Sequence, residues 1–362
     1  MTENKKDIVR VLHILMQKSP SIAIIGHINP DGDAICSALA MRSLIRKNTH
    51  SNIGGFISKK VDLFFDCEHL PKSLDPITKK KDCIYTQPTQ TKYDLVICVD
   101  CNNVERLGKF KPLFENAKRT INIDHHMDNT GFADVNFVNA KASSTCEEIY
   151  KIFSSNLKKT YNYQLPKVAY GYIYVGILTD TNNLQNNCKN PATSRVISDV
   201  ITKIGTKEAN TIKSYLFQNL PTAKSMLTSY SFDRRNRKYY YDDSICMICL
   251  DRKVFEKAGA ELDDAEGIVD QGLSMEGVKI CALILEKNKG EFLVKLRGKD
   301  VDVCEIAHKF NGGGHENMAG FSYNGNLNVL KKNLLNACQD KLFENQEETD
   351  EQLLEDFFKT DN

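Results

Sequence analysis

The sequence predicts an α/β protein whose first half holds a parallel sheet covered by helices on both faces. Short apolar, β-branched runs at 22–28, 95–100 and 120–124 alternate with stretches of helical periodicity, which is typical of strands joined by crossover helices. Polar motifs follow these runs, and ligands of such sheets bind beyond the carboxyl ends of the strands. We therefore expect a functional site at one edge of the sheet.

The elements follow from local patterns. The first twenty residues carry charges among their apolar positions and no small-residue cleavage site, so we expect a helix and not a signal peptide. The Ser-Ser-Thr start of the stretch at 143–154 supplies N-cap oxygens for a helix. From the amino terminus, the predicted elements are a helix at 1–20, a strand at 22–28, a helix at 34–47, strands at 95–100 and 120–124, and helices at 143–154, 166–180 and 191–204.

A chain of 362 residues is long enough for two domains. A second, smaller α/β domain is predicted from strand-like runs at 280–286 and 292–297. We expect the active site in the cleft between the two domains. The predicted boundaries are 1–205 for the first domain, 206–238 for a helical connector, 239–342 for the second domain and 343–362 for an acidic tail.

Charge is unevenly distributed. The tail at 343–362 holds eight acidic residues against Lys359 alone, so its net charge is −7. Because the whole chain has a net charge of +1, residues 1–342 carry +8. A body of that sign favours an anionic substrate but is too weakly basic for wrapping long duplexes. No run reaches the roughly eighteen consecutive apolar residues of a membrane-spanning helix.

Twelve cysteines without framework spacing point to a reducing, cytoplasmic location. Two Cys-x-x-Cys pairs, Cys98 with Cys101 and Cys246 with Cys249, raise the alternative of a zinc site. Both pairs lie in strand-like runs, and positions three apart on a strand point to opposite faces. Buried free thiols are therefore the favoured interpretation.

Carboxylates and imidazoles gather in four motifs at or near the ends of apolar segments. Each motif alone has a structural explanation, such as a turn that caps a helix. Together they suit a pair of divalent cations and the hydrolysis of a phosphoester. Such hard ligands favour manganese, with magnesium or cobalt as substitutes, whereas thiolates favour zinc. The motifs are His27-Ile-Asn-Pro-Asp31-Gly-Asp33, Asp100, Asp124-His125-His126 and Thr179-Asp180-Thr181.

In order and approximate spacing, these motifs resemble those of the DHH phosphoesterase superfamily. Residues 265–269, 294–297 and 310–320 resemble that family's DHH-associated domain. The resemblance is nearest to the oligoribonuclease and pAp phosphatase group. It implies hydrolysis of short oligoribonucleotides, of 3′-phosphoadenosine 5′-phosphate (pAp), or of both, to mononucleotides by a water that two metals activate. Members of this group often have glycine and phenylalanine after the fourth aspartate, where this chain has Asp180-Thr-Asn-Asn-Leu184.

The resemblance also implies a role for each matching residue. It gives His27 and Asp31 to one metal, and makes Asp100 the bridge to a second. That second metal takes Asp33, His125 and Asp180. His126 would face the substrate phosphate, while Asp124 would fix an imidazole. Asp100, His126 and Asp124 thus form the expected catalytic set.

The glycine cluster Gly312–His315 is the candidate substrate contact in the second domain. Most glycine runs bind nothing, but before a helix they expose N–H groups that can hold a phosphate. The resemblance implies that Gly313, Gly314 and His315 grip the nucleotide end.

Two arginines are further candidates for phosphate contacts. Arg297, at the end of a strand-like run, could make a bidentate contact. Arg106 could do the same or could lie on a helix surface.

The expected partner is short single-stranded RNA or a small nucleotide, not a membrane or a long duplex, and a homodimer is left open. One alternative is a phosphodiesterase of cyclic di-AMP or of its linear product pApA. Another is an inorganic pyrophosphatase or polyphosphatase. A non-catalytic nucleotide-binding module is the third, although all six proposed ligands are present.

Overall fold

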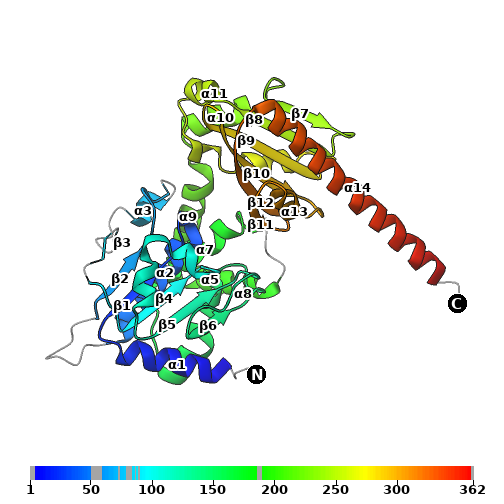
Figure 1. The fold of residues 1–362 in the computed structure, drawn as a ribbon. Coiled ribbons are helices and arrows are strands. Elements are labelled where there is room, and N and C mark those ends of the chain that lie inside the picture. Colours follow the sequence, from blue (N-terminus) through cyan, green and yellow to red (C-terminus); the bar gives the residue numbers. More distant parts are fainter. Residues whose placement is uncertain are drawn as a thin grey trace. The chain divides into compact units, whose positions relative to one another are not determined.

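The computed structural model describes residues 5–49, 59–71, 74–78, 84–85, 87–88, 90–185 and 190–359. They divide into two compact units, Met1–Asn219 and Leu220–Asn362 (Figure 1). The division falls inside the stretch that the sequence predicts as a connector. Two helices occupy that stretch, α9 (Thr206–Gln218) in the first unit and α10 (Thr222–Ser231) in the second.

A parallel sheet with the strand order β3-β2-β1-β4-β5-β6 forms the centre of the first unit. Ile22 of the first strand pairs with Val61 on one side and Leu95 on the other. The order therefore reverses between β1 and β4, and doubly wound sheets bind ligands at such a switch point. The strands are β1 (Ile22–Ile25), β2 (Val61–Phe64), β3 (Ile84–Tyr85), β4 (Leu95–Val99), β5 (Thr120–Asp124) and β6 (Val135–Val138).

Both faces of this sheet are covered, as predicted. Ile22 and Ile24 point into a large core with the longer helices, whereas Ala23 and Ile25 point into a smaller one on the other face. The large core is built with α1 (Lys5–Lys18), α2 (Gly32–Asn48), α5 (Thr145–Ile152), η3 (Phe153–Leu157), α7 (Lys167–Asp180) and α8 (Pro191–Ile204). The smaller core is built with η2 (Val104–Phe110) and α4 (Lys111–Glu115). Two short helices complete the unit, α3 (Asp75–Thr78) and α6 (Lys158–Tyr161).

Two glycines allow α2, α5 and α7 to approach closely. A Cβ atom on Gly32 would collide with the Thr179 side chain, and one on Gly176 would collide with Cys146 and approach Asp33. These contacts bring the start of α2 and the end of α7 together.

The second unit is built on a mixed sheet with the order β11-β12-β10-β9-β8-β7. Only the β8–β9 pair is parallel among the described pairings. Its strands are β7 (Arg237–Tyr240), β8 (Ile245–Leu250), β9 (Ile280–Asn288), β10 (Glu291–Gly298), β11 (Gly313–His315) and β12 (Met318–Asn324). One face packs on α13 (Val303–His308) and α14 (Leu327–Lys359). The other packs on α10, α11 (Arg252–Ala258), η4 (Leu262–Ala265) and α12 (Ile268–Leu273).

The strand β2 was not predicted. A buried acid, Asp62, interrupts its apolar pattern, and the Tyr93 hydroxyl compensates for the burial by donating a hydrogen bond of 2.8 Å. The predicted strand at 22–28 ends at Ile25, because the turn that carries the first polar motif begins at once.

The prediction for the first Cys-x-x-Cys pair was wrong in its geometry. Cys98 and Cys101 pack in the same core, because Asp100 between them adopts a left-handed backbone conformation with a φ of 56°. Cys246 and Cys249 do face opposite cores. The described cysteines are free thiols, and none of them joins a metal-binding group in the described part of the chain.

Candidate metal centre

The polar motifs of the first unit converge beyond the carboxyl ends of β1, β4 and β5. Asp100 directly follows β4, and Asp124 ends β5. Asp33 lies in the first turn of α2, and Asp180 is the last residue of α7. Ligand atoms come within 4.8 Å of one another in three groups, which are His27–Asp31–Asp100, Asp33–His125–Asp180 and Asp100–Asp124–His125–His126.

Asp100 lies at the centre of these groups. One carboxylate oxygen is 3.6 Å from Nε2 of His27, and the other is 3.5 Å from Nε2 of His125. The side chain is only 2% exposed. Burial alone would raise the pKa of Asp100, but the hydrogen bond with His27 and the charge of His125 outweigh it and hold that pKa well below its usual value. Asp100 is therefore an ionised carboxylate shared by both sides of the centre.

Two polar neighbours contact Nδ1 of His27. The carbonyl oxygen of Ile28 lies 2.7 Å away, and Nη2 of Arg106 lies 3.2 Å away. Nε2 of the same ring faces Asp31 at 3.9 Å and Asp100. The carbonyl of Arg106 also accepts a hydrogen bond from the Ile28 N–H. Arg106 thus lies beside this group.

The second group contains two buried acids. Asp33 accepts hydrogen bonds from the backbone N–H groups of Thr145 at 2.6 Å and Cys146 at 3.0 Å, at the N-terminus of α5. Oδ2 of Asp180 is buried, lies 3.6 Å from Nε2 of His125 and has no hydrogen-bond partner among the described residues. Burial and the charge of Asp100 raise the pKa values of both acids well above normal.

These observations test whether the residues fit a cation. Clustered, buried carboxylates repel one another, and an orphaned buried oxygen costs free energy unless something charged or polar meets it. Imidazole lone pairs and carboxylate oxygens on one rim are the ligands that a hard or borderline divalent ion prefers. The residues of this centre therefore fit divalent cations.

His126 is held differently from the other two imidazoles. Its Nδ1 donates to Oδ1 of the fully buried Asp124 at 2.7 Å. The side-chain amide of Asn129 donates to the other Asp124 oxygen at 2.6 Å. Burial lowers the pKa of His126, but the hydrogen bond to Asp124 outweighs it and raises the pKa to about 9. His126 is thus a cationic group oriented by Asp124.

Comparison with known proteins agrees with this geometry. Residues 21–177 match the family described as "DHH family, N-terminal domain", and residues 245–342 match the "DHHA1 domain". The chain belongs to the DHH superfamily. It is accordingly a hydrolase of phosphoesters.

Similar DHH relatives cover almost the whole chain. A Streptococcus mutans protein named "Probable bifunctional oligoribonuclease and PAP phosphatase NrnA" is 26% identical over 83% of this chain and 88% of its own length. A Mycoplasma pneumoniae protein named "Bifunctional oligoribonuclease and PAP phosphatase NrnA" is 24% identical over 90% and 94%. The fold matches that of a solved exopolyphosphatase-related protein from Bacteroides fragilis, with a TM-score of 0.81, 23% identity and coverage of 92% and 96%.

Thr145 and Asn129 were missed by the sequence analysis of this DHH domain. The Ser-Ser-Thr motif was interpreted only as a helix cap. Ser144 does cap α5, but Thr145 uses its hydroxyl to bind Asp100 at 3.0 Å. Asn129 has no sequence signal, because an asparagine in a polar loop is usually part of a turn.

The DHHA1 domain corrects one expectation. The glycine cluster does not precede a helix, because Gly313–His315 forms β11 and pairs with β12 as an antiparallel hairpin. A phosphate site at a helix N-terminus is therefore absent from this described segment. Gly314 is needed for close approach, since a Cβ atom there would collide with the Met318 carbonyl, whereas a Cβ atom on Gly313 would meet no atom within 4 Å. The side chain of His315 lies outside the described part of the chain.

Arg297 of β10 is held by an ion pair. Its Nε donates to Oδ1 of Asp270 at 2.8 Å, and the side chain is 18% exposed. This pairing fixes the orientation of the guanidinium.

In the described residues, no helix is long and apolar enough to cross a bilayer.

Proposed function

We propose that this DHH protein hydrolyses short oligoribonucleotides, pAp, or both, to mononucleotides, using two divalent cations. The observation that carries the proposal is the position of Asp100, whose two carboxylate oxygens face two separate histidines, each accompanied by further acids. The relatives named as oligoribonucleases and pAp phosphatases support the substrate class. We also propose a cytoplasmic location, and a homodimer stays an open alternative.

The proposed ligands divide between two cations. His27 and Asp31 would hold one, and Asp100 would contact both. The second would be held by Asp33, His125 and Asp180. Oxygen and imidazole ligands suit Mn²⁺, with Mg²⁺ or Co²⁺ as substitutes. Two such cations make a water between them more acidic and neutralise charge on the phosphoryl oxygens.

The protein's own side chains would orient the substrate. The hydrogen bond to Asp124 raises the pKa of His126 and so favours its protonated form, and a positive charge there can stabilise an anionic phosphoryl group. Asp124 keeps the ring in place, and Asn129 keeps Asp124 in place. Arg106, beside His27, would add a second cationic contact.

The DHHA1 residues are proposed to contact the nucleotide portion of the substrate. Arg297 is oriented by Asp270, which prepares its remaining N–H groups for a phosphate. Gly313 and Gly314 present backbone close to the surface, and His315 continues the same strand. We expect losses at these positions to raise KM more than they lower kcat.

A phosphodiesterase acting on pApA or cyclic di-AMP is the second candidate. The loop after Asp180 lacks the glycine and phenylalanine that are common in the oligoribonuclease and pAp phosphatase group. Its residues Asn182, Asn183 and Leu184 all have positive φ angles, and Leu184 is 40% exposed. We therefore expect the surface beside Asp180, a proposed metal ligand, to differ from that of the oligoribonuclease and pAp phosphatase group.

One panel of substrates tests the proposal. Rates with Mn²⁺ would be measured for pAp, pApA, cyclic di-AMP, short RNAs and pyrophosphate. Asp100→Asn should abolish turnover, by about a thousandfold or more. Glu115→Gln changes an exposed acid on α4 and should leave rates unchanged. Preferential cleavage of pyrophosphate, or full activity of Asp100→Asn, would contradict the proposal.

A further inference from the structure

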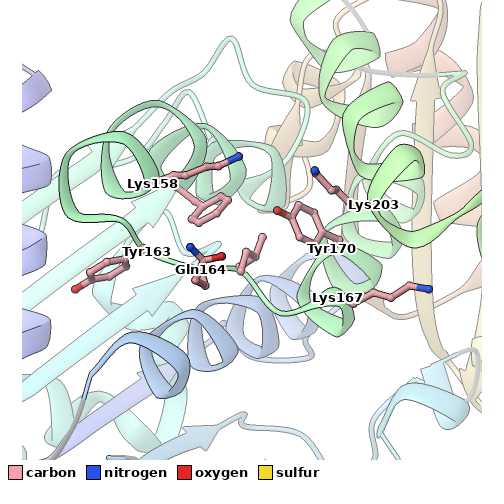
Figure 2. A pocket seen from close by; sticks show the side chains of 8 residues that line it. Lys158, Tyr163, Gln164, Lys167, Tyr170 and Lys203 are labelled. Carbon is pink, nitrogen blue, oxygen red and sulfur yellow. The ribbon is translucent and has the colours of Figure 1, made fainter.

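A cavity of about 280 Å³ lies in the first unit, apart from the metal groups (Figure 2). Its lining comes from η3, α6, the segment that follows and the first turn of α7, together with Lys203 of α8. None of the proposed metal ligands lines it. Tyr170 in the lining and Asp180 at the centre lie ten residues apart on α7, which is about 15 Å along a helix.

The charged groups of this lining are all cationic. Lys158, Lys167 and Lys203 line the cavity, and no carboxylate does. Lys167 forms an ion pair with Glu208 at 3.0 Å. Lys158 and Lys203 are exposed and form no ion pair with the described residues. Two ammonium groups at one opening favour an anionic ligand.

Tyr170 presents its hydroxyl to the cavity. The residue is only 8% exposed, and its hydroxyl forms no hydrogen bond with the described residues. The hydroxyl oxygen is not among the buried polar atoms that lack a partner, so it is accessible from the cavity and can donate a hydrogen bond to a ligand there. Figure 2 shows this hydroxyl and the amino groups of Lys158 and Lys203 around the same opening, whereas Lys167 extends away from them. The nearby Asp199 accepts instead from the Tyr150 hydroxyl, at 3.3 Å.

Two further features define the class of ligand. The helix α7 begins at Lys167 without a side-chain cap, so its first N–H groups place positive potential near the cavity. Phe153 and Leu165 make another part of the lining apolar. A ligand that matches both parts has a phosphate and a compact organic portion.

We propose that this cavity binds a small phosphate ester, such as a nucleoside monophosphate. Lys158, Lys203 and the Tyr170 hydroxyl contact the phosphate, and the organic portion packs against Phe153 and Leu165. The site is separate from the metal centre and does not depend on the function proposed there.

Hydrogen exchange with AMP as the probe tests the proposal on the full chain. At AMP concentrations up to about 1 mM, we expect slower backbone exchange at 158–170 in the wild type. The double variant Lys158→Gln/Lys203→Gln should bind AMP there about tenfold more weakly or worse. The matched control, Lys159→Gln/Lys207→Gln, changes two exposed lysines on α6 and α9 outside the lining and should bind normally. Tyr170→Phe, which removes one oxygen, should weaken binding without altering the circular dichroism spectrum.

The control ligands separate the alternatives. Adenosine or inorganic phosphate giving the same protection as AMP would overturn the assignment of a phosphate ester. Protection confined to the segments that carry the metal motifs would overturn the second site, while leaving the proposed function standing. Equal protection in the wild type and the lysine double variant would also contradict the proposal.

Discussion

The hydroxyl of Thr145 donates a hydrogen bond of 3.0 Å to Asp100, and both side chains are buried. The backbone N–H of the same threonine donates to Asp33 at 2.6 Å. One residue at the start of α5 therefore fixes a carboxylate of each proposed cation site. Such outer contacts orient metal ligands and tune their affinity.

Thr145→Val removes the hydroxyl and keeps the shape of the side chain. We expect Mn²⁺ affinity to fall by about 10- to 100-fold, because Asp100 loses a donor while Asp33 keeps its backbone donors. Thr145→Ser retains the hydroxyl and should bind Mn²⁺ nearly as well as the wild type. Calorimetric titration of chelator-treated protein measures both. Unchanged affinity in Thr145→Val would show that the hydrogen bond does not position Asp100.

Removal of metal should destabilise the protein. Asp33, Asp100 and Asp180 lie close together with little exposure, and burial raises the pKa of Asp33 and of Asp180, so a cation that neutralises these carboxylates should stabilise the folded state. A cation at about a hundred times its Kd stabilises the folded state by about 2.7 kcal/mol. Thermal unfolding with Mn²⁺ and with a chelator measures the difference. In Asp180→Asn the shift in Tm should shrink, whereas Glu115→Gln should retain the full shift. A wild-type Tm that is insensitive to chelator would contradict the metal centre.

Two glycines of α7 provide a matched pair for stability. Gly176→Ala would push its methyl group into Cys146 and toward Asp33, and we expect a loss of about 1–3 kcal/mol in the free energy of unfolding. A methyl group added at Gly171 would meet no atom within 4 Å. Gly171→Ala should therefore stabilise the helix by about 0.5–1 kcal/mol. Urea unfolding distinguishes them, and equal effects would show that α7 does not pack as described.

The decrease in the free energy of unfolding at acidic pH should depend on Asp94. Hydrogen bonds from Lys118 and Ser21 lower the pKa of this carboxyl from 3.8 to about 2. Its folded pKa lies below its unfolded pKa, so its contribution is present above 3.8 and is lost as the pH falls toward about 2. Asp94→Asn should lower stability near neutral pH and flatten the decline within that window. Parallel pH profiles for the two proteins would contradict this prediction.

The sequence predicts which acids and imidazoles the structure brings together, because these residues follow strands in chain order. His27, Asp100 and Asp124 each stand where a strand ends, and a parallel sheet brings those ends together. Thr145 was not predictable in the same way, because a hydroxyl beside a capping serine looks like part of the cap. Its contact with Asp100 depends on how α5 packs against β5 and α2.

The other errors also come from tertiary structure. The strand β2 was missed because Asp62 interrupts its apolar pattern. This buried acid is tolerated because the Tyr93 hydroxyl donates a hydrogen bond to it. Because Asp100 has a left-handed backbone conformation, the side chain of Cys101 packs in the same core as that of Cys98. The glycine cluster formed a hairpin because the partner strand Met318–Asn324 lies three residues later, and pairing of this kind does not appear in a local pattern.

Anomalous diffraction from crystals grown with Mn²⁺ would locate the proposed cations. We expect two manganese peaks, one beside His27 and Asp31, the other beside Asp33, His125 and Asp180, with Asp100 contacting both. Active protein whose crystals show no manganese at these side chains, or a single peak that does not touch Asp100, would contradict the proposal.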